Sequence, residues 1–132
     1  MKVIAVLILA SLLYTSSPAG NSQYECHALA TLHLEENGSL VKDDVWDGAT
    51  FSVDRDSGRI EGAIDNLDWP EKRVIEKGTD LSAFTLVWVS DGMPTDPNAS
   101  KAGYLEIQEW VDSDVKPFLM VLATYVISGT CT

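Results

Sequence analysis

Apolar and polar residues alternate with a period of two along most of the chain. In the first such segment, residues 26–35, the small and apolar side chains fall on one face: Cys26, Ala28, Ala30, Leu32 and Leu34. A strand turns alternate side chains to opposite faces of a sheet, so we expect a half-buried strand with this face inward. Asn37-Gly38 follows as a tight-turn signal, because both residues tolerate a positive φ.

The same period predicts further short strands, which are separated by turns rich in Gly, Pro, Asp and Asn: 51–53, 59–64, 73–76, 83–90, 103–111 and 117–128. Segment 83–90 is apolar on both faces, so we expect it to be central or covered on both sides. No segment has a sustained helical period with caps. The prediction is an all-β fold, a small antiparallel meander barrel or sandwich of seven or eight strands.

The start of the chain departs from this pattern. Met1-Lys2 is followed by the apolar run Val3–Leu13 and the small-residue stretch Thr15–Gly20. A short basic start, an apolar core too short to span a bilayer and a small-residue tail are typical of a cleavable secretory signal. We therefore predict that residues 1–19 are a signal peptide and residues 20–132 a single exported β domain. This domain is expected in the periplasm or secreted, with no stable membrane insertion after cleavage.

Export changes the interpretation of the two cysteines, Cys26 and Cys131. In an oxidising compartment an even number of cysteines pairs by default. Cys26 opens the first predicted strand and Cys131 follows the last, so a bond between them brings the ends of these strands within about 7 Å. In an antiparallel meander this favours an even strand number and adjacent terminal strands. A nearly closed barrel meets both conditions, and a sandwich with both strands in one sheet also does.

The charge balance narrows the choice of partner. The chain has 9 basic and 20 acidic residues, a net charge of −11. Such a surface repels nucleic-acid phosphates and anionic lipid head groups, so nucleic acid is not an expected partner. It favours cations or basic molecules.

No motif indicates a metal site, a cofactor or a catalytic group. His27 and His33 share a face, but six residues along a strand span about 20 Å, too far for two ligands of one ion. The run Asp54 to Gly58 is interpreted as a hairpin turn rather than a calcium loop. Glu106 and Glu109 are expected on opposite faces of their strand. A small hydrolase using acidic residues therefore remains only an alternative function.

Loop tryptophans flanked by acids suggest where a ligand could bind. Trp46 and Trp69 each combine an aromatic ring with an N–H donor, and Asp91 and Asp96 belong to the longest irregular segment, residues 91–102. These four residues form the candidate ligand-binding surface, for a protein or a small molecule. The alternative is that the tryptophans anchor loops over the ends of the barrel.

Four segments together carry a resemblance to a known family: FSVDRDSGRIEG (51–62), VIEKGTDLSAF (74–84), YLEIQEWVDSDVKPF (104–118) and SGTC (128–131). In this order they resemble a family of small exported proteins of Gram-negative bacteria for which no activity is assigned. The resemblance implies an exported, periplasmic protein and transfers no catalytic residues. We predict a non-catalytic binding or interaction module of the bacterial envelope. A structural or inhibitory protein that works by strand addition is a further alternative.

Overall fold

The computed structural model describes residues 22–64, 71–89 and 102–132, which form β-strands and no helix. The nine strands are β1 (Gln23–Leu34), β2 (Leu40–Asp43), β3 (Thr50–Asp54), β4 (Ile60–Gly62), β5 (Glu71–Thr79), β6 (Ser82–Val89), β7 (Ala102–Ile107), β8 (Lys116–Leu122) and β9 (Tyr125–Cys131). Within these ranges no helix is long and apolar enough to cross a membrane. The predicted signal peptide, Trp69, Asp91 and Asp96 lie outside the described residues.

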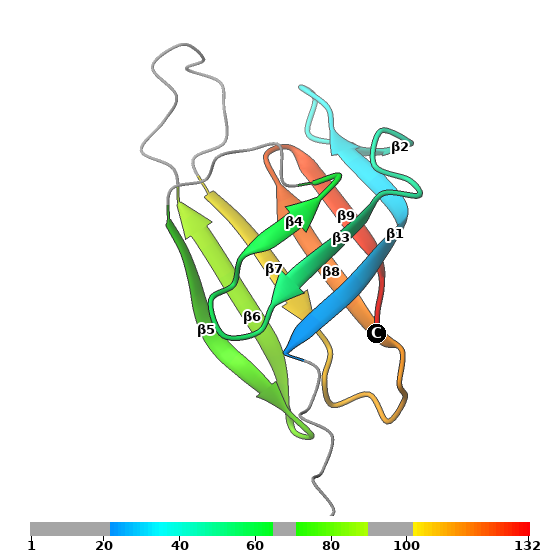
Figure 1. The fold of residues 1–132 in the computed structure, drawn as a ribbon. Helices are drawn as coiled ribbons and strands as arrows, with labels where there is room; N and C mark the ends of the chain where they lie inside the picture. The colour runs from blue at the N-terminus through cyan, green and yellow to red at the C-terminus, as the bar shows by residue number, and fades with distance from the viewer. Residues whose placement is uncertain (1–21, 65–70, 90–101) are drawn as a thin grey trace, which may run out of the picture.

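All nine strands belong to one antiparallel sheet, which curls into a half-barrel (Figure 1). Its order is β4-β3-β1-β9-β8-β7-β6-β5, and β2 pairs with the second half of β1. The predicted all-β class is therefore confirmed. The described residues contain one strand more than the upper prediction. Residues 40–43 form β2, and a two-residue turn at Ala123 and Thr124 divides the predicted strand 117–128 into β8 and β9.

The predicted disulfide is present and joins the first and last strands. Cys26 and Cys131 are directly opposite each other on β1 and β9, with their Cα atoms 4.0 Å apart. Beyond them, Glu25 and Thr132 exchange two backbone hydrogen bonds of 3.0 and 2.9 Å. The β1–β9 junction connects two runs of sequential strands: β1, β3 and β4 on one side, and β9 back to β5 on the other. The disulfide thus crosslinks the two halves of the sheet.

A bulge in β1 overturns the predicted facing of its second half. The register with β9 shifts between Ala28 and Ala30, so Leu29 is an extra residue and the alternation changes phase there. Thr31 is completely buried, whereas Leu32 and Leu34 are 38% and 44% exposed. The expectation that both leucines face inward is wrong, because strict alternation cannot anticipate an inserted residue.

The inner face of the sheet carries a continuous core, in which eight large side chains are at least 98% buried: Phe84, Leu86, Trp88, Leu105, Ile107, Met120, Leu122 and Ile127. Trp88 is the largest side chain of this core. Its ring lies over Gly103 on the adjacent strand β7, where an added Cβ would come within 2.0 Å of the indole. Core side chains therefore occupy the inside of the half-barrel.

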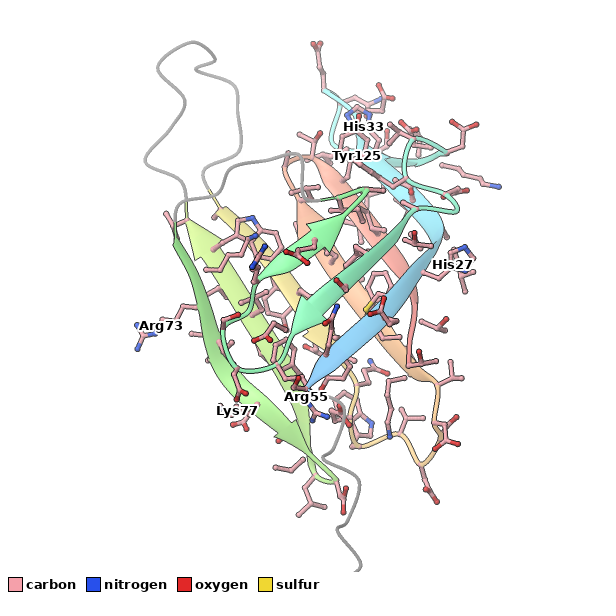
Figure 2. The ribbon with its side chains drawn as sticks, viewed as in Figure 1. His27, His33, Arg55, Arg73, Lys77 and Tyr125 are labelled. Atoms are coloured by element: carbon pink, nitrogen blue, oxygen red, sulfur yellow. A yellow bond between two sulfur atoms is a disulfide. The ribbon has the colours of Figure 1, made fainter. Side chains whose placement is uncertain are left out.

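Strands β4 and β5 are the two ends of the sheet order and do not pair with each other. Residues of the β3–β4 turn contact β5 and the neighbouring core instead. Gly58 has a φ of +73° and lies so close to the core that a Cβ there would be 2.4 Å from Leu86 Cδ1. In the same turn, Asp56 forms an ion pair of 2.7 Å with Lys77 of β5. Figure 2 shows Lys77 and Arg55 at this end of the molecule. Side chains therefore connect the two edges where backbone pairing does not.

Candidate interaction surface

The outward-facing side of the sheet carries a row of apolar residues that crosses five strands. Strand registers place seven outward residues in one line from β2 to β5: Lys42, Leu32, Val126, Val121, Tyr104, Val87 and Arg73. The five central positions are apolar or aromatic, and a cation stands at each end. Figure 2 shows Arg73 projecting outward from β5.

Neighbouring outward positions widen this row. Leu34 and Leu40 are opposite each other on β1 and β2, Leu119 is two residues before Val121 on β8, and Val89 is two residues after Val87 on β6. We use the name apolar band for the whole set: Leu32, Leu34, Leu40, Val87, Val89, Tyr104, Leu119, Val121 and Val126.

Leucine is the informative residue type in this band. Valine and tyrosine on an outer strand face are explained by their preference for strands, but leucine lacks that preference. Leu119, Leu34 and Leu40 are nevertheless 40%, 44% and 53% exposed. Contiguous exposed apolar patches of this kind are typical of interaction sites. The nine strands form a single sheet, so the described residues place no second layer on this face.

One end of the apolar band is strongly acidic. The β1–β2 turn, β2 and the loop that follows contribute five carboxylates, which we call the acidic end: Glu35, Glu36, Asp43, Asp44 and Asp47. Lys42 is the cation of this segment. Leu34, Leu40 and the 53% exposed Val45 lie among these carboxylates in the sequence. The surface here combines apolar contact area with negative charge.

Buried contacts with β1 fix the loop that bears part of the acidic end. The Thr31 hydroxyl donates a 3.0 Å hydrogen bond to Asp47 Oδ1, and the N–H of Gly48 donates to the Ala28 carbonyl at 2.9 Å. The partly buried ring of Trp46 packs against the core and meets Tyr125 edge-on, at 6.5 Å between ring centroids. The bulge at Leu29 makes this possible, because it turns Thr31 inward.

Only one of the four predicted ligand-binding residues lies in the described part of the chain. Trp46 anchors its loop, and its Nε1 is buried without a hydrogen-bond partner among the described residues. Trp69, Asp91 and Asp96 are outside those residues. Of the two histidines, His27 faces solvent as expected. His33 lies on the inner side beside Tyr125, at 4.9 Å between ring centroids, because the bulge reverses its direction (Figure 2).

The other cations of the described residues lie outside the acidic end, on the β3–β4 turn, on β5 and at the start of β8. Ion pairs join Arg55 to Glu109 at 3.3 Å, Lys116 to Glu109 at 4.0 Å, Lys77 to Asp56 at 2.7 Å, and Arg59 to Glu61. These ion pairs place cations beside carboxylates in this part of the molecule, whereas the acidic end carries carboxylates in excess. Within residues 35–47, Lys42 is the one cation.

Glu109 is the centre of a cluster of polar and charged side chains at one end of the half-barrel. Its carboxylate is 14% exposed, accepts a hydrogen bond from the Tyr24 hydroxyl, and lies 3.3 Å from Arg55 and 4.0 Å from Lys116. Burial, and next the hydrogen bond to Glu109, raise the pKa of Tyr24 well above its usual value. Because Tyr24 belongs to β1 and Arg55 to the β3–β4 turn, Glu109 ties the β7–β8 loop to both.

The carboxylate of Asp54 accepts hydrogen bonds from residues of its own turn, which agrees with the interpretation of this segment as a hairpin turn. Asp54 Oδ1 accepts hydrogen bonds from the N–H groups of Asp56 and Ser57 and from the Ser57 hydroxyl, at 2.7 to 3.1 Å. These bonds lower the pKa of Asp54. Residues 22–64, 71–89 and 102–132 contain no group of three or more His, Cys, Asp or Glu side chains that could hold a metal ion.

Comparison with known proteins assigns no function to this arrangement. The chain matches no protein-family model, no curated protein and no solved structure. The apolar band itself was not found by reasoning from the sequence. Its signal was present in segment 83–90, whose two apolar faces predicted a strand that is central or covered on both sides. In the structure this strand, β6, lies between β5 and β7, and on its outer face Val87 is half-buried and Val89 is 56% exposed.

Proposed function

We propose that this chain is a non-catalytic interaction module of the bacterial envelope that binds a protein partner through the apolar band. The observation that carries the proposal is the row of five apolar residues across β1, β9, β8, β7 and β6, with exposed leucines beside it. Burying apolar area contributes about 25 cal/mol per Å², so a partner gains free energy by covering this face.

Export of the chain is part of the same proposal. The leader-like residues 1–19 and the resemblance to small exported Gram-negative proteins both favour the periplasm. A disulfide between Cys26 and Cys131 fits that compartment, because thiols remain reduced in the cytosol.

A hydrolase using acidic residues is less well supported. Glu106 faces outward and accepts a hydrogen bond from Tyr104, while Glu109 lies on the end of the half-barrel. Glu109 lies 3.3 Å from Arg55 and 4.0 Å from Lys116, an arrangement that suits a structural ion-pair cluster more than a general acid or base.

Strand addition has one observation in its favour, since β5 is a nine-residue strand at an end of the sheet. Two features of β5 oppose it. A bulge lies between Val74 and Glu76, and Lys72 and Lys77 are opposite the inward residues Trp88 and Phe84. Bulges and inward-pointing charges are common means of protecting an edge from another strand.

Site-specific photocrosslinking tests the proposal. A photoreactive amino acid is placed at Leu119 in the apolar band, or at the half-buried Ser52 on the outer face of β3 as a matched control. Both proteins are expressed with their leader and irradiated in intact bacteria, and the crosslinked products are identified by mass spectrometry. We expect a defined protein adduct from position 119 and none from position 52.

If the apolar band binds the partner, the adduct at position 119 must be lost when other residues of the band are replaced. Adding Leu32→Ser and Val121→Ser to the photoreactive protein should abolish the crosslink at position 119, and the purified partner should bind the unmodified chain but not this variant. Equal crosslinking from both positions, or no adduct from position 119, would contradict a role for the apolar band.

A further inference from the structure

We infer that the partner presents a cationic amphipathic segment to the acidic end of the apolar band, with leucine-like side chains on one face and lysine or arginine beside them. This inference rests on the proposed function and specifies the partner's chemistry. It follows from three properties of the surface: exposed apolar side chains, adjacent carboxylates, and the distribution of cations over the rest of the sheet.

Apolar contact area is available at this end in strand-paired geometry. Leu34 and Leu40 are opposite each other and 44% and 53% exposed, and Leu32 beside them is 38% exposed. Val45, which is 53% exposed, lies in the loop after β2 and adds to the exposed apolar area of the acidic end. The apolar face of an amphipathic segment could cover these side chains, which alone would not select for charge.

The carboxylates supply the selection. Glu35, Glu36 and Asp44 are exposed. Glu35 has one weak contact, 3.8 Å from the His33 ring, while Asp43 and Asp47 accept hydrogen bonds from Val45 N–H and the Thr31 hydroxyl. These two carboxylates lie on the side of the buried Thr31, so they add negative charge to this end, whereas Glu35, Glu36 and Asp44 are the ones available for direct contact. A segment with lysine or arginine beside its apolar face therefore matches both properties.

A second copy of this chain fits this end less well. Each copy has a net charge of −11, so two copies repel. The cations that could compensate are largely engaged: Arg55, Arg59 and Lys77 are each paired with a carboxylate of the same chain. Anionic lipid surfaces are repelled by the same carboxylates.

Three synthetic peptides of equal length test the inference. The first is an amphipathic helix of leucine and lysine, the second replaces every lysine with glutamate, and the third replaces every leucine with serine. Binding to the disulfide-bonded protein is measured by calorimetry at low and at high salt. We expect the leucine–lysine peptide alone to bind measurably, and more weakly at high salt, because added ions screen the charge pairs.

Two sets of variants locate the site. Leu34→Ser with Leu40→Ser removes apolar contact and should weaken binding at least tenfold, since burying one leucine contributes about 1.5 to 3 kcal/mol. Glu35→Gln, Glu36→Gln and Asp44→Asn together should weaken binding several-fold and flatten its salt dependence. The matched control, Glu25→Gln with Asp112→Asn and Asp114→Asn, makes the same change in net charge at exposed positions elsewhere and should leave binding unchanged.

Circular dichroism of each variant verifies that the fold is intact; if a serine pair disturbs it, alanine at the same positions replaces it. Equal binding of the leucine–glutamate peptide, equal weakening by the control triple variant, or a dimer in sedimentation that Leu34→Ser and Leu40→Ser abolish would each overturn the inference. If position 119 crosslinks to a protein while the leucine–lysine peptide does not bind, the inference fails and the proposed function stands. If both results are negative, both fail.

Discussion

The outer surface of this sheet has two regions that obey the same strand rules but differ in composition. On β3, β4 and the first half of β1 the outward residues are polar or charged: Gln23, Glu25, His27, Thr50, Ser52, Asp54 and Glu61. On β9, β8, β7 and β6 the outward residues include most of the apolar band, beside the polar Thr85, Glu106, Ser128 and Thr130. The inner face is apolar beneath both regions, so the needs of the core do not explain the difference. Solubility alone would favour the polar composition everywhere, and the apolar region therefore points to contact with another molecule.

The two regions meet where the chain is crosslinked. The β1–β9 junction carries the disulfide, and the bulge at Leu29 moves the second half of β1 from the polar pattern to the apolar one. One inserted residue thus decides to which region Leu32 and Leu34 belong. The comparison teaches that the direction in which the side chains of a strand point, rather than the composition of the segment, creates this surface.

The largest effect on the free energy of unfolding is expected from removing the disulfide that joins the two halves of the sheet. Replacing Cys26→Ala and Cys131→Ala should lower the free energy of unfolding by about 4 to 5 kcal/mol, because the bond closes a loop with a sequence separation of 105 residues. Urea denaturation measures this difference. Wild-type protein kept reduced is the matched control and should unfold at the same urea concentration as the variant. Identical midpoints for oxidised and reduced wild type would show that the disulfide does not hold the halves together.

A smaller effect on the free energy of unfolding is expected within β8, where neighbouring residues lie on the inner face and in the apolar band. Met120 is fully buried, so Met120→Ala should lower the free energy of unfolding by about 2 to 5 kcal/mol. Its neighbour Leu119 is 40% exposed, and Leu119→Ala should change it by about 0.5 kcal/mol or less. Thermal denaturation of the two variants gives the comparison. A large loss for Leu119→Ala would mean that another part of this chain already covers the band.

The smallest effect concerns the one phenol of the apolar band. A hydrogen bond to Glu106, followed by burial, raises the pKa of Tyr104 from 10.0 to about 12. The folded state thus holds this proton more tightly than the unfolded state. The stability that results is complete below pH 10 and declines as the pH rises from 10 towards 12.

Tyr104→Phe removes this ionisation, so the variant should lose less stability than wild type across that range. Stability measured by urea denaturation from pH 8 to 12 tests it. Tyr24→Phe serves as the comparison on the inner face, where the phenol also has a raised pKa. Parallel curves for wild type and Tyr104→Phe would show that the pKa of Tyr104 is the same in the folded and unfolded states and would contradict the raised pKa.

Some of the candidate site could have been predicted and some could not. Segment 83–90 signalled an apolar outer face correctly, because neither of its faces is polar. The leucines of β1 were assigned to the core, because alternation counts residues and a bulge adds one without a strong sequence mark. The part played by β2 was missed as well, since Leu40 to Asp43 is too short for a period to emerge.

By itself, the sequence determined the class of the fold and its covalent closure. Period-two alternation specifies strands because side chains alternate across a sheet, and two cysteines at the ends of that pattern have no other partner. The tertiary structure alone decided the strand order, the phase of β1 after Leu29 and the joining of residues from six strands into one apolar surface. Those features depend on register between segments far apart in the chain, which is set by packing against partners rather than by the residues of any one segment.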